Sequence, residues 1–437
     1  MGRSKFARLS RCNDVASIER SFRDDAGRAL ATLAKMLGDI EAAEDAIQDA
    51  YLVALERWPR EGHPKHASAW ILTTARHRAI DKLRRERRGR EKAERLAALE
   101  FGAPSRDPFA EDREMNVIPD DRLGLMFACC HPGLGVEARI ALTLRTLGGL
   151  STEEIAEAFL VPSATIAQRL VRVKRKIRDA AIPLDVPAPE RLPERLADVC
   201  SVLYLIFNEG YLASAGDSLV RRDLCDEAIR LTRVLAHLMP QEPEVMGLLA
   251  LMLYHHSRRD ARSDSDERLI PLAEQDRKLW DDTAIAEANA FMERAARHQF
   301  EGPYQLQAAI AAEHARAREL GRVDWERIAE LYTHLAAIAP SPIVDLNRAV
   351  ALGFACGPLL GLAALDAIDA RALETYHPAY VARADFLRRL GREAEARDAY
   401  AAALALTQNA RERAFLEAKM LEAGASVTPR DDERDGR

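Results

Sequence analysis

Apolar residues recur at helical spacing along most of the chain. From about residue 14 to 96, and again from about 122 to 182, hydrophobic side chains return every three or four positions, which places them on one face of a helix. The same spacing continues from about residue 195 to 424. No segment of any length alternates apolar and polar positions as a half-buried strand would. The pattern predicts an all-α protein.

Two segments interrupt the helical pattern. Residues 101–121, FGAPSRDPFAEDREMNVIPDD, are rich in Pro, Gly and acidic residues, and residues 182–194, IPLDVPAPERLPE, hold four prolines. Such composition is typical of linkers. The predicted organisation is a helical domain over 14–97, a linker over 98–121, a helical domain over 122–182, a linker over 183–194, a helical extension over 195–424 and a disordered tail over 425–437.

Residues 151–178, STEEIAEAFLVPSATIAQRLVRVKRKIR, predict two helices joined by a short turn. Ser151 and Glu154 have the spacing of a capping box, in which each side chain binds a backbone N–H at the helix start. The LVP triplet ends this helix, and we expect Ser163 to cap the next one. The expected core positions of the second helix are Ile166, Leu170, Val173 and Ile177.

The opposite face of this second helix is polar and basic. Residues 163–178 contain six basic residues and no acidic ones. Polar groups near the start of such a helix can contact base edges, and cations further along can neutralise phosphates. An ordinary solvated basic helix is the alternative. The candidate DNA-binding residues are Ser163, Thr165, Gln168, Arg169, Arg172, Lys174 and Arg175.

A second basic helix is predicted over residues 66–95, which hold ten Lys and Arg against four Asp and Glu. Its expected apolar face comprises Trp70, Ile71, Ala75, Ala79, Ile80 and Leu83. The loop before it, flanked by Trp58 and Trp70, could hold unstacked bases of a single strand, unless both tryptophans belong to the core. The candidate nucleic-acid contacts are Lys65, Trp70, Arg76, Arg78, Lys82, Arg84 and Arg85.

An acidic helix is predicted upstream, over residues 39–58. Its expected inward positions are Ala43, Ala46, Ile47, Ala50 and Leu55. An acidic, partly apolar surface beside a basic helix suggests docking to a second protein that is basic there. The acidic surface comprises Glu41, Glu44, Asp45, Gln48 and Asp49.

Composition refines this picture. The 437 residues are enough for several domains. The net charge of -6 is unevenly distributed: residues 1–186 hold 32 basic against 28 acidic residues, and residues 187–437 hold 31 against 41. The acidic excess therefore lies away from the predicted DNA-binding helices. Six scattered cysteines, no membrane span and no signal peptide lead us to expect a cytoplasmic protein without membrane contact.

Candidate catalytic and metal sites are weak. Cys129, Cys130 and His131 are consecutive and cannot comfortably chelate one tetrahedral ion, so we expect buried free thiols. His255 and His256 are adjacent and point to different helix faces. A catalytic pair of Glu209 and Asp276 would need the fold to bring them together. We therefore expect a protein that is not an enzyme and needs no cofactor.

The acidic helix with DAIQD, the segment AWILTTARHRAIDKLRR and the helix pair ending TIAQRLVRVKRK together resemble one family. It is the extracytoplasmic-function group of sigma-70-type RNA polymerase sigma factors. The resemblance implies that residues 14–97 are region 2 and residues 122–182 are region 4, the helix-turn-helix domain. Region 2 would melt and bind the minus-ten element, and region 4 would bind the minus-thirty-five element of promoter DNA.

The resemblance also implies contacts with core RNA polymerase. Region 2 would dock on the β′ clamp helices, and region 4 on the β flap. Family members commonly have Glu and Phe where this chain has Asp49 and Tyr51, and Asn where it has His77. The implied docking residues are Glu44, Asp45, Gln48 and Asp49.

The extension resembles that of a branch of this group with tetratricopeptide-like repeats, including the segment LYLIFNEGY at 203–211. Independently, one repeat unit is indicated by its small and aromatic residues. Weaker matches run from Ala228 to Pro240 and from Ile328 to Pro340, and we expect a degenerate α-solenoid. The residues at the repeat offsets are Tyr380, Ala384, Leu387, Gly391, Ala396, Tyr400 and Ala403.

These observations predict a transcription initiation factor that acts by binding. The extension would regulate it through contact with the sigma domains, or would bind an unknown regulatory partner. The alternative is a one-component helix-turn-helix regulator with a ligand-sensing helical domain, which has no need of the acidic docking helix. A scaffold without DNA binding is a third class.

Overall fold

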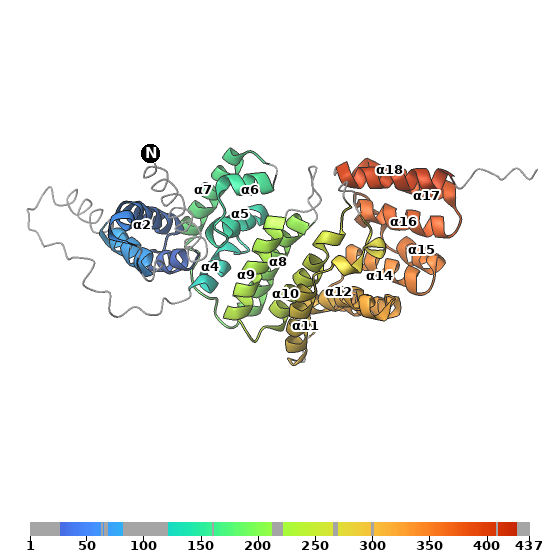
Figure 1. Cartoon of the computed structure of the whole chain (residues 1–437), viewed down its shortest axis with the longest axis horizontal. Helices are drawn as coiled ribbons and strands as arrows, with labels where there is room; N and C mark the ends of the chain where they lie inside the picture. Colours follow the sequence, from blue (N-terminus) through green and yellow to red (C-terminus); the bar gives the residue numbers. More distant parts are fainter. Residues whose placement is uncertain are drawn as a thin grey trace, which may run out of the picture. The chain divides into compact units, whose positions relative to one another are not determined.

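A computed structural model of the chain describes residues 27–62, 64, 69–81, 121–159, 161–211, 222–264, 270–298, 301–407 and 410–425. These residues form α-helices and short 3-10 helices, and no strand occurs among them, which confirms the predicted all-α class (Figure 1). The chain divides into two compact units, Met1–Val202 and Leu203–Arg437. The predicted linker over 98–121 lies mostly outside the described residues, and the tail over 425–437 almost entirely so.

The first unit holds two groups of helices. A helix over residues 27–37, α2 (Ile40–Glu61) and a helix over 69–81 form the first group. The second group comprises α4 (Arg122–Cys129), α5 (Val136–Thr146), α6 (Thr152–Ala158) and α7 (Ser163–Asp179). Helix α8 (Leu192–Tyr211) follows and runs through the division into the second unit.

Local chemistry sets the helix starts in this unit. Asp39 caps α2, because its carboxylate accepts from the backbone N–H groups of Glu41 and Ala42 at 2.8 and 3.3 Å. The predicted capping box of α6 is confirmed: Ser151 N–H donates to Glu154 at 2.7 Å and Glu154 N–H donates to Ser151 Oγ at 3.0 Å. The prediction that Ser163 caps α7 is wrong. Pro162 occupies the N-cap position with a non-helical backbone (φ -58°, ψ 139°). Ser163 is therefore the first helical residue and does not cap the helix.

The Pro-rich segment before α8 is mostly exposed but is anchored at its start. Ile182 and Leu184 are buried. A Cβ added to Gly124 in α4 would lie 2.5 Å from Leu184 O, so only glycine allows this close approach. The segment is therefore anchored on the helix-turn-helix group.

The second unit is a succession of helices in which neighbours in sequence pack on one another (Figure 1). Its α-helices are α9 (Arg222–Leu238), α10 (Pro243–Ser257), α11 (Asp282–Ala296), α12 (Pro303–Leu320), α13 (Trp325–Ile338), α14 (Pro342–Ala355), α15 (Pro358–Asp366), α16 (His377–Arg389), α17 (Glu393–Leu406) and α18 (Ala410–Ala425). Among the residues described in this unit, four 3-10 helices lie between them: η2 (Arg259–Ala261), η3 (Leu272–Glu274), η4 (Arg277–Leu279) and η5 (Ala370–Leu373). This serial packing is characteristic of a solenoid.

The predicted repeat unit corresponds to α16 and α17. Ala384, Ala396 and Ala403 are fully buried, so the two helix backbones approach closely. Gly391 lies in the turn with φ 73°, a left-handed conformation that favours glycine. Helix α10 is different, since its own apolar residues cover almost all of its faces and are buried. It packs against α9, α11 and α12 as the central helix of its part of the unit.

Candidate nucleic-acid interface

Helix α7 has the two faces predicted for a recognition helix. Ile166, Leu170, Val173 and Ile177 are all buried, as expected. They hold α7 against α5 and α6, which leaves its opposite side available. On that side the side chains of Ser163, Gln168, Arg172 and Arg175 are exposed, and Thr165 is half-buried.

The cations on the open face of α7 are held lightly by their own domain. Arg169 pairs with Glu137 of α5. Arg172 Nε donates to Gln168 O at 3.3 Å, and Arg175 pairs with Asp179 at 3.3 Å one turn later. Ion pairs on an exposed face contribute little and exchange readily with phosphate.

Lys174 lies apart from this group. Its Nζ binds Glu44 of α2, and the two side chains are only 13% and 18% exposed. One turn later, Arg178 reaches Asp39 at 3.4 Å and Glu41 at 3.3 Å. The structure thus brings a predicted DNA contact, Lys174, against a predicted polymerase contact, Glu44. These two side chains were expected to serve separate surfaces.

The outer face of α2 carries the other predicted docking residues. Asp45, Gln48 and Asp49 are exposed. Leu52 continues the same face one turn later and is 62% exposed. Sequence reasoning missed Leu52, although its spacing from Asp45, Gln48 and Asp49 is that of one helix face.

One core prediction for α2 is wrong, because Leu55 is 44% exposed. The buried row runs through Ala43, Ala50, Ala54 and Trp58, which are seven, four and four residues apart and so lie on one helix face. Leu55 follows that row by one position, a rotation of about 100°, and so points away from the core.

The second predicted nucleic-acid helix is described over residues 69–81. Ile71, Ala75 and Ala79 are buried as expected. Trp58 is 4% exposed and belongs to the core. The half-buried Trp70 packs on it edge to face, with ring centres 5.4 Å apart.

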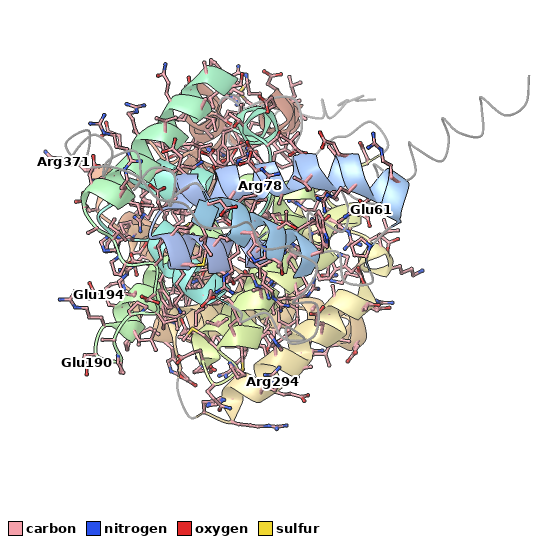
Figure 2. All side chains as sticks on the ribbon, turned by 90° about the vertical axis from the view of Figure 1, so that its left-hand side faces the viewer. Glu61, Arg78, Glu190, Glu194, Arg294 and Arg371 are labelled. Atoms are coloured by element: carbon pink, nitrogen blue, oxygen red, sulfur yellow. The ribbon has the colours of Figure 1, made fainter. Side chains whose placement is uncertain are left out.

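The described basic side chains of this helix face outward. Arg76 and Arg78 are exposed, and Figure 2 shows Arg78 on the near side of the ribbon. The other candidates, Lys65, Lys82, Arg84 and Arg85, lie outside the described residues.

Cys129 and Cys130 are fully buried, in line with the prediction of buried thiols. Cys129 Sγ lies 3.2 Å from Thr146 Oγ1, and Cys130 Sγ 3.7 Å from Thr143 Oγ1. Burial raises the pKa of the Cys130 thiol to about 12 and raises that of Cys129 as well, so both stay protonated. Neutral thiols bind metals poorly. No group of metal-ligating side chains occurs within the described parts of the chain.

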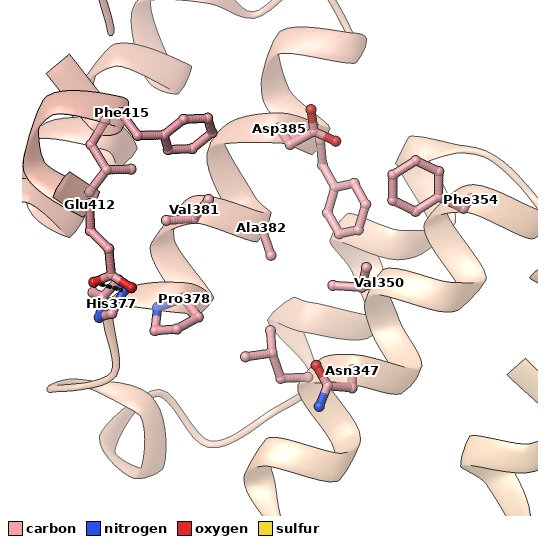
Figure 3. Close-up of a pocket in the computed structure, with 13 residues that line it drawn as sticks. Asn347, Val350, Phe354, His377, Pro378, Val381, Ala382, Asp385, Glu412 and Phe415 are labelled. Carbon is pink, nitrogen blue, oxygen red and sulfur yellow. Dashed lines mark ion pairs between the residues drawn. The ribbon is translucent and has the colours of Figure 1, made fainter. Parts of the chain in front are cut away.

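The second unit contains an apolar pocket of about 360 Å³ between α14, α16 and α18 (Figure 3). Val350, Phe354 and Phe415 supply apolar surface, and His377 Nε2 lies 3.4 Å from Glu412 at one end.

The two adjacent histidines point to different faces, as predicted. His256 pairs with Asp226 at 3.2 Å, whereas His255 lies beside Tyr211. No described helix is long and apolar enough to cross a membrane.

Three family descriptions match the chain. "Sigma-70 region 2" matches residues 22–89, and "Sigma-70, region 4" matches residues 125–177. "Family of unknown function (DUF6596)" matches residues 195–296. The first two matches coincide with the acidic and basic helices and with the helix-turn-helix.

Several relatives are similar to the chain. "Uncharacterized protein R00370" of Rhizobium meliloti (strain 1021) is 44% identical over 390 residues, covering 89% of this chain and 92% of that protein. "Probable ECF RNA polymerase sigma factor SigI" of Mycobacterium tuberculosis is 28% identical over 169 residues, 38% of this chain and 57% of its own length. "ECF RNA polymerase sigma factor SigE" of Mycolicibacterium smegmatis is 28% identical over 165 residues, 38% of this chain and 62% of its own length.

The two sigma domains imply association with core RNA polymerase and with promoter DNA. A one-component regulator would not account for the region 2 match, which includes the acidic helix. The chain therefore belongs to the extracytoplasmic-function group of sigma-70-type RNA polymerase sigma factors, and carries a helical extension after its two sigma domains.

Proposed function

We propose that the chain delivers core RNA polymerase to promoters through one docking surface and two DNA contacts. The observation that carries this proposal is the division of α7 into a buried apolar face and an open face with Gln168 and Arg172. Such a helix, following the capped α6, fits the major groove. Members of this family act by binding, and we infer that this chain likewise catalyses no reaction. Because it works with polymerase, it works in the cytoplasm.

The proposed minus-thirty-five contacts are the residues of the open face of α7. Thr165 and Gln168 would lie at base edges, with arginines on the phosphates. Lys174 can join them only after it leaves Glu44. The full set is Ser163, Thr165, Gln168, Arg169, Arg172, Lys174 and Arg175.

The proposed minus-ten contacts lie on and around the helix over 69–81. The half-buried Trp70 would stack on a base, and the exposed Arg76 and Arg78 suit a phosphate backbone. The full set is Lys65, Trp70, Arg76, Arg78, Lys82, Arg84 and Arg85.

Docking on the β′ clamp helices is proposed for the outer face of α2, with region 4 on the β flap. Asp45, Gln48 and Asp49 would meet cations of the clamp helices, and the exposed Leu52 adds apolar area at the same place. Glu44 becomes available when Lys174 is released.

Charge reversal tests the docking surface. The double variant Asp45→Lys/Asp49→Lys should bind core polymerase at least tenfold more weakly in a pull-down titration, because like charges at an interface repel. Glu61→Lys, an exposed position at the end of the same helix, is the matched control and should bind normally. Normal binding by the double variant would contradict the proposed docking surface.

Loss of cations tests the recognition helix. Arg169→Ala with Arg172→Ala should weaken promoter binding about tenfold or more, since each arginine contributes about 1 kcal/mol or more to phosphate or base contacts. The slope of affinity against salt should also fall by about 2. Unchanged affinity across the salt series would favour the scaffold alternative.

The extension is proposed to regulate the sigma domains in cis or to bind a regulatory partner. Its support is electrostatic: residues 187–437 carry 31 basic against 41 acidic residues, opposite in sign to residues 1–186. An acidic partner domain can compete with DNA for basic helices.

A further inference from the structure

Three arginines converge around two aromatic rings in the second unit. Arg262 lies over the Tyr211 ring, with its guanidinium carbon 3.7 Å from the ring centre. The guanidinium carbon of Arg258 is 5.8 Å from the ring centres of both Tyr211 and Trp280. Arg277 is 5.8 Å from the Trp280 centre. Arg258 therefore stands between the other two.

This group, which we call the arginine cluster (Arg258, Arg262 and Arg277), is partly withdrawn from water, since Arg258 and Arg277 are half-buried. Arg262 is 6% exposed and Trp280 is 3% exposed. Arg262 donates to Tyr211 O, and Arg258 donates to the Tyr211 hydroxyl. An arginine cannot lose its proton in a protein, so the cluster keeps its three positive charges.

No carboxylate lies within ion-pair distance of the arginine cluster among the described residues. The neighbouring Arg259 shows the contrast, because it reaches Asp281 at 2.9 Å and Asp260 at 3.7 Å. Glu412 attracts Arg262 only from a distance, and its carboxylate is bound by Thr407 at 2.8 Å. A buried cation without a nearby counter-charge is costly, so a counter-anion is expected beside Arg262.

Hydrogen-bond donors at the same place also lack acceptors. Arg277 Nε and Trp280 Nε1 are buried without a hydrogen-bond partner. Such unsatisfied groups are rare and commonly mark an ion or water.

The two nearby histidines, His255 and His314, add no charge to the cluster. Burial, followed by repulsion from Arg258 and Arg277, lowers the pKa of His314 to about 4. Burial, with Arg258 and Arg262, holds the pKa of His255 well below its usual range. Both rings are therefore neutral at pH 7, and the local field is that of the arginines.

We propose that the arginine cluster binds a phosphoryl group, either free phosphate or the phosphate of a small ligand, with Trp280 Nε1 as a further donor. Guanidinium groups match phosphate oxygens with paired N–H donors. Three cations around the two neighbouring rings suit a dianion better than a single carboxylate. This site goes beyond the sigma function and does not depend on the role proposed for the extension.

Phosphate titration of the full chain tests the site. Thermal unfolding and titration calorimetry with inorganic phosphate, against chloride at equal ionic strength, should show saturable binding and a rise in Tm. Arg262→Gln should weaken binding at least tenfold, whereas Arg259→Gln, the adjacent paired arginine, should bind as the unchanged chain does. If Arg262→Gln does not fold, as judged by circular dichroism, Arg277→Gln at the cluster's edge takes its place.

Several results would overturn the site. No saturable binding by the unchanged chain would rule out a phosphoryl site at the cluster. Equal binding by the cluster variant and the control would place phosphate elsewhere. Adenosine monophosphate distinguishes the ligand sources: tighter binding than phosphate indicates a phosphorylated ligand, and weaker binding indicates the free ion. Both of these results support a phosphoryl site.

Discussion

Lys174 is a proposed DNA contact, yet in the structure it pairs with Glu44 of α2. Its charge is buried against Glu44, so it cannot at the same time neutralise a promoter phosphate. A lysine and a carboxylate that exclude water are costly to separate unless each finds a new partner. DNA for Lys174 and polymerase for Glu44 would be such partners.

A double-mutant cycle measures this pair. Glu44→Gln and Lys174→Met should each lower the free energy of unfolding by about 1–3 kcal/mol, because each leaves a mostly buried charge without its partner. The double variant should lose less than the sum of the two. Arg175→Met, whose partner Asp179 is exposed, is the control and should change stability by less than about 0.5 kcal/mol. Additive losses at positions 44 and 174 would show that the pair does not form.

His314 predicts how stability depends on pH. Its pKa is lowered to about 4 in the folded chain from an ordinary value of 6.5, so the unfolded chain binds the proton more tightly. The stabilisation is therefore fully present above about pH 6.5 and is lost as the pH falls toward 4. His255 acts in the same direction.

Denaturant unfolding between pH 4 and 7 tests this. His314→Phe keeps an aromatic ring beside Trp325, whose ring centre is 5.4 Å away, and removes the titration. The variant should lose less stability on acidification than the unchanged chain. The exposed His298 is the control, and His298→Phe should keep the full pH dependence. An unchanged slope in His314→Phe would mean that His314 is not the group responsible.

At the scale of elements, close helix packing depends on glycine. A Cβ added to Gly247 in α10 would lie 2.7 Å from the backbone N of Gln305 in α12. Because a backbone atom cannot rotate away as a side chain can, the two helices would have to separate.

Gly247→Ala should therefore lower the free energy of unfolding by about 1–3 kcal/mol, measured by denaturant titration. Gly135→Ala is the matched control, since its added Cβ meets nothing within 4 Å and its φ is -66°. Helix propensity alone would make Gly247→Ala stabilising, so an increase in stability would show that the helices adjust freely.

Elements with a strong local signal could be predicted from sequence. The capping box of α6 and the buried row of α7 depend on residues three or four positions apart, and both were found. Leu55 was placed in the core although it lies one position beyond the buried row, and Ser163 was taken as the cap although the helix begins one residue earlier than expected. A shift of one residue decides each of these assignments.

Long-range contacts could not be predicted. Glu44 and Lys174 are 130 residues apart, and neither position marks the other. The arginine cluster brings Arg258 and Arg262 against Tyr211, 47 and 51 residues earlier in the chain, with no motif that links them. Sequence therefore predicted which residues face solvent or core better than which residues meet.

At the scale of the whole molecule, charge separates the sigma domains from the extension. Truncation tests whether that separation regulates transcription. A chain ending at Val202 is the sharpest choice, because it keeps Asp198, which lies 3.3 Å from Arg139 of α5, and Arg195, which binds Phe127 O. A cut nearer the Pro-rich segment would remove both and damage region 4.

In run-off transcription with core polymerase, the truncated chain should differ from the full chain in activity or promoter choice. Circular dichroism and core binding provide the control for folding. Equal transcription by both chains would contradict regulation in cis and leave partner binding as the role of the extension.

Finally, each of the two units contains a buried cysteine whose reaction with a thiol reagent requires that unit to open. Cys129 and Cys130 lie in the first unit and Cys225 in the second, and all three are sealed from solvent, whereas Cys356 is exposed. A thiol reagent should modify Cys356 at once and the sealed thiols only when their unit transiently opens. The labelling rate of the buried cysteines thus measures how often each unit opens, separately for the two units. A ligand or polymerase that stabilises one unit should lower the labelling rate of that unit's cysteines first.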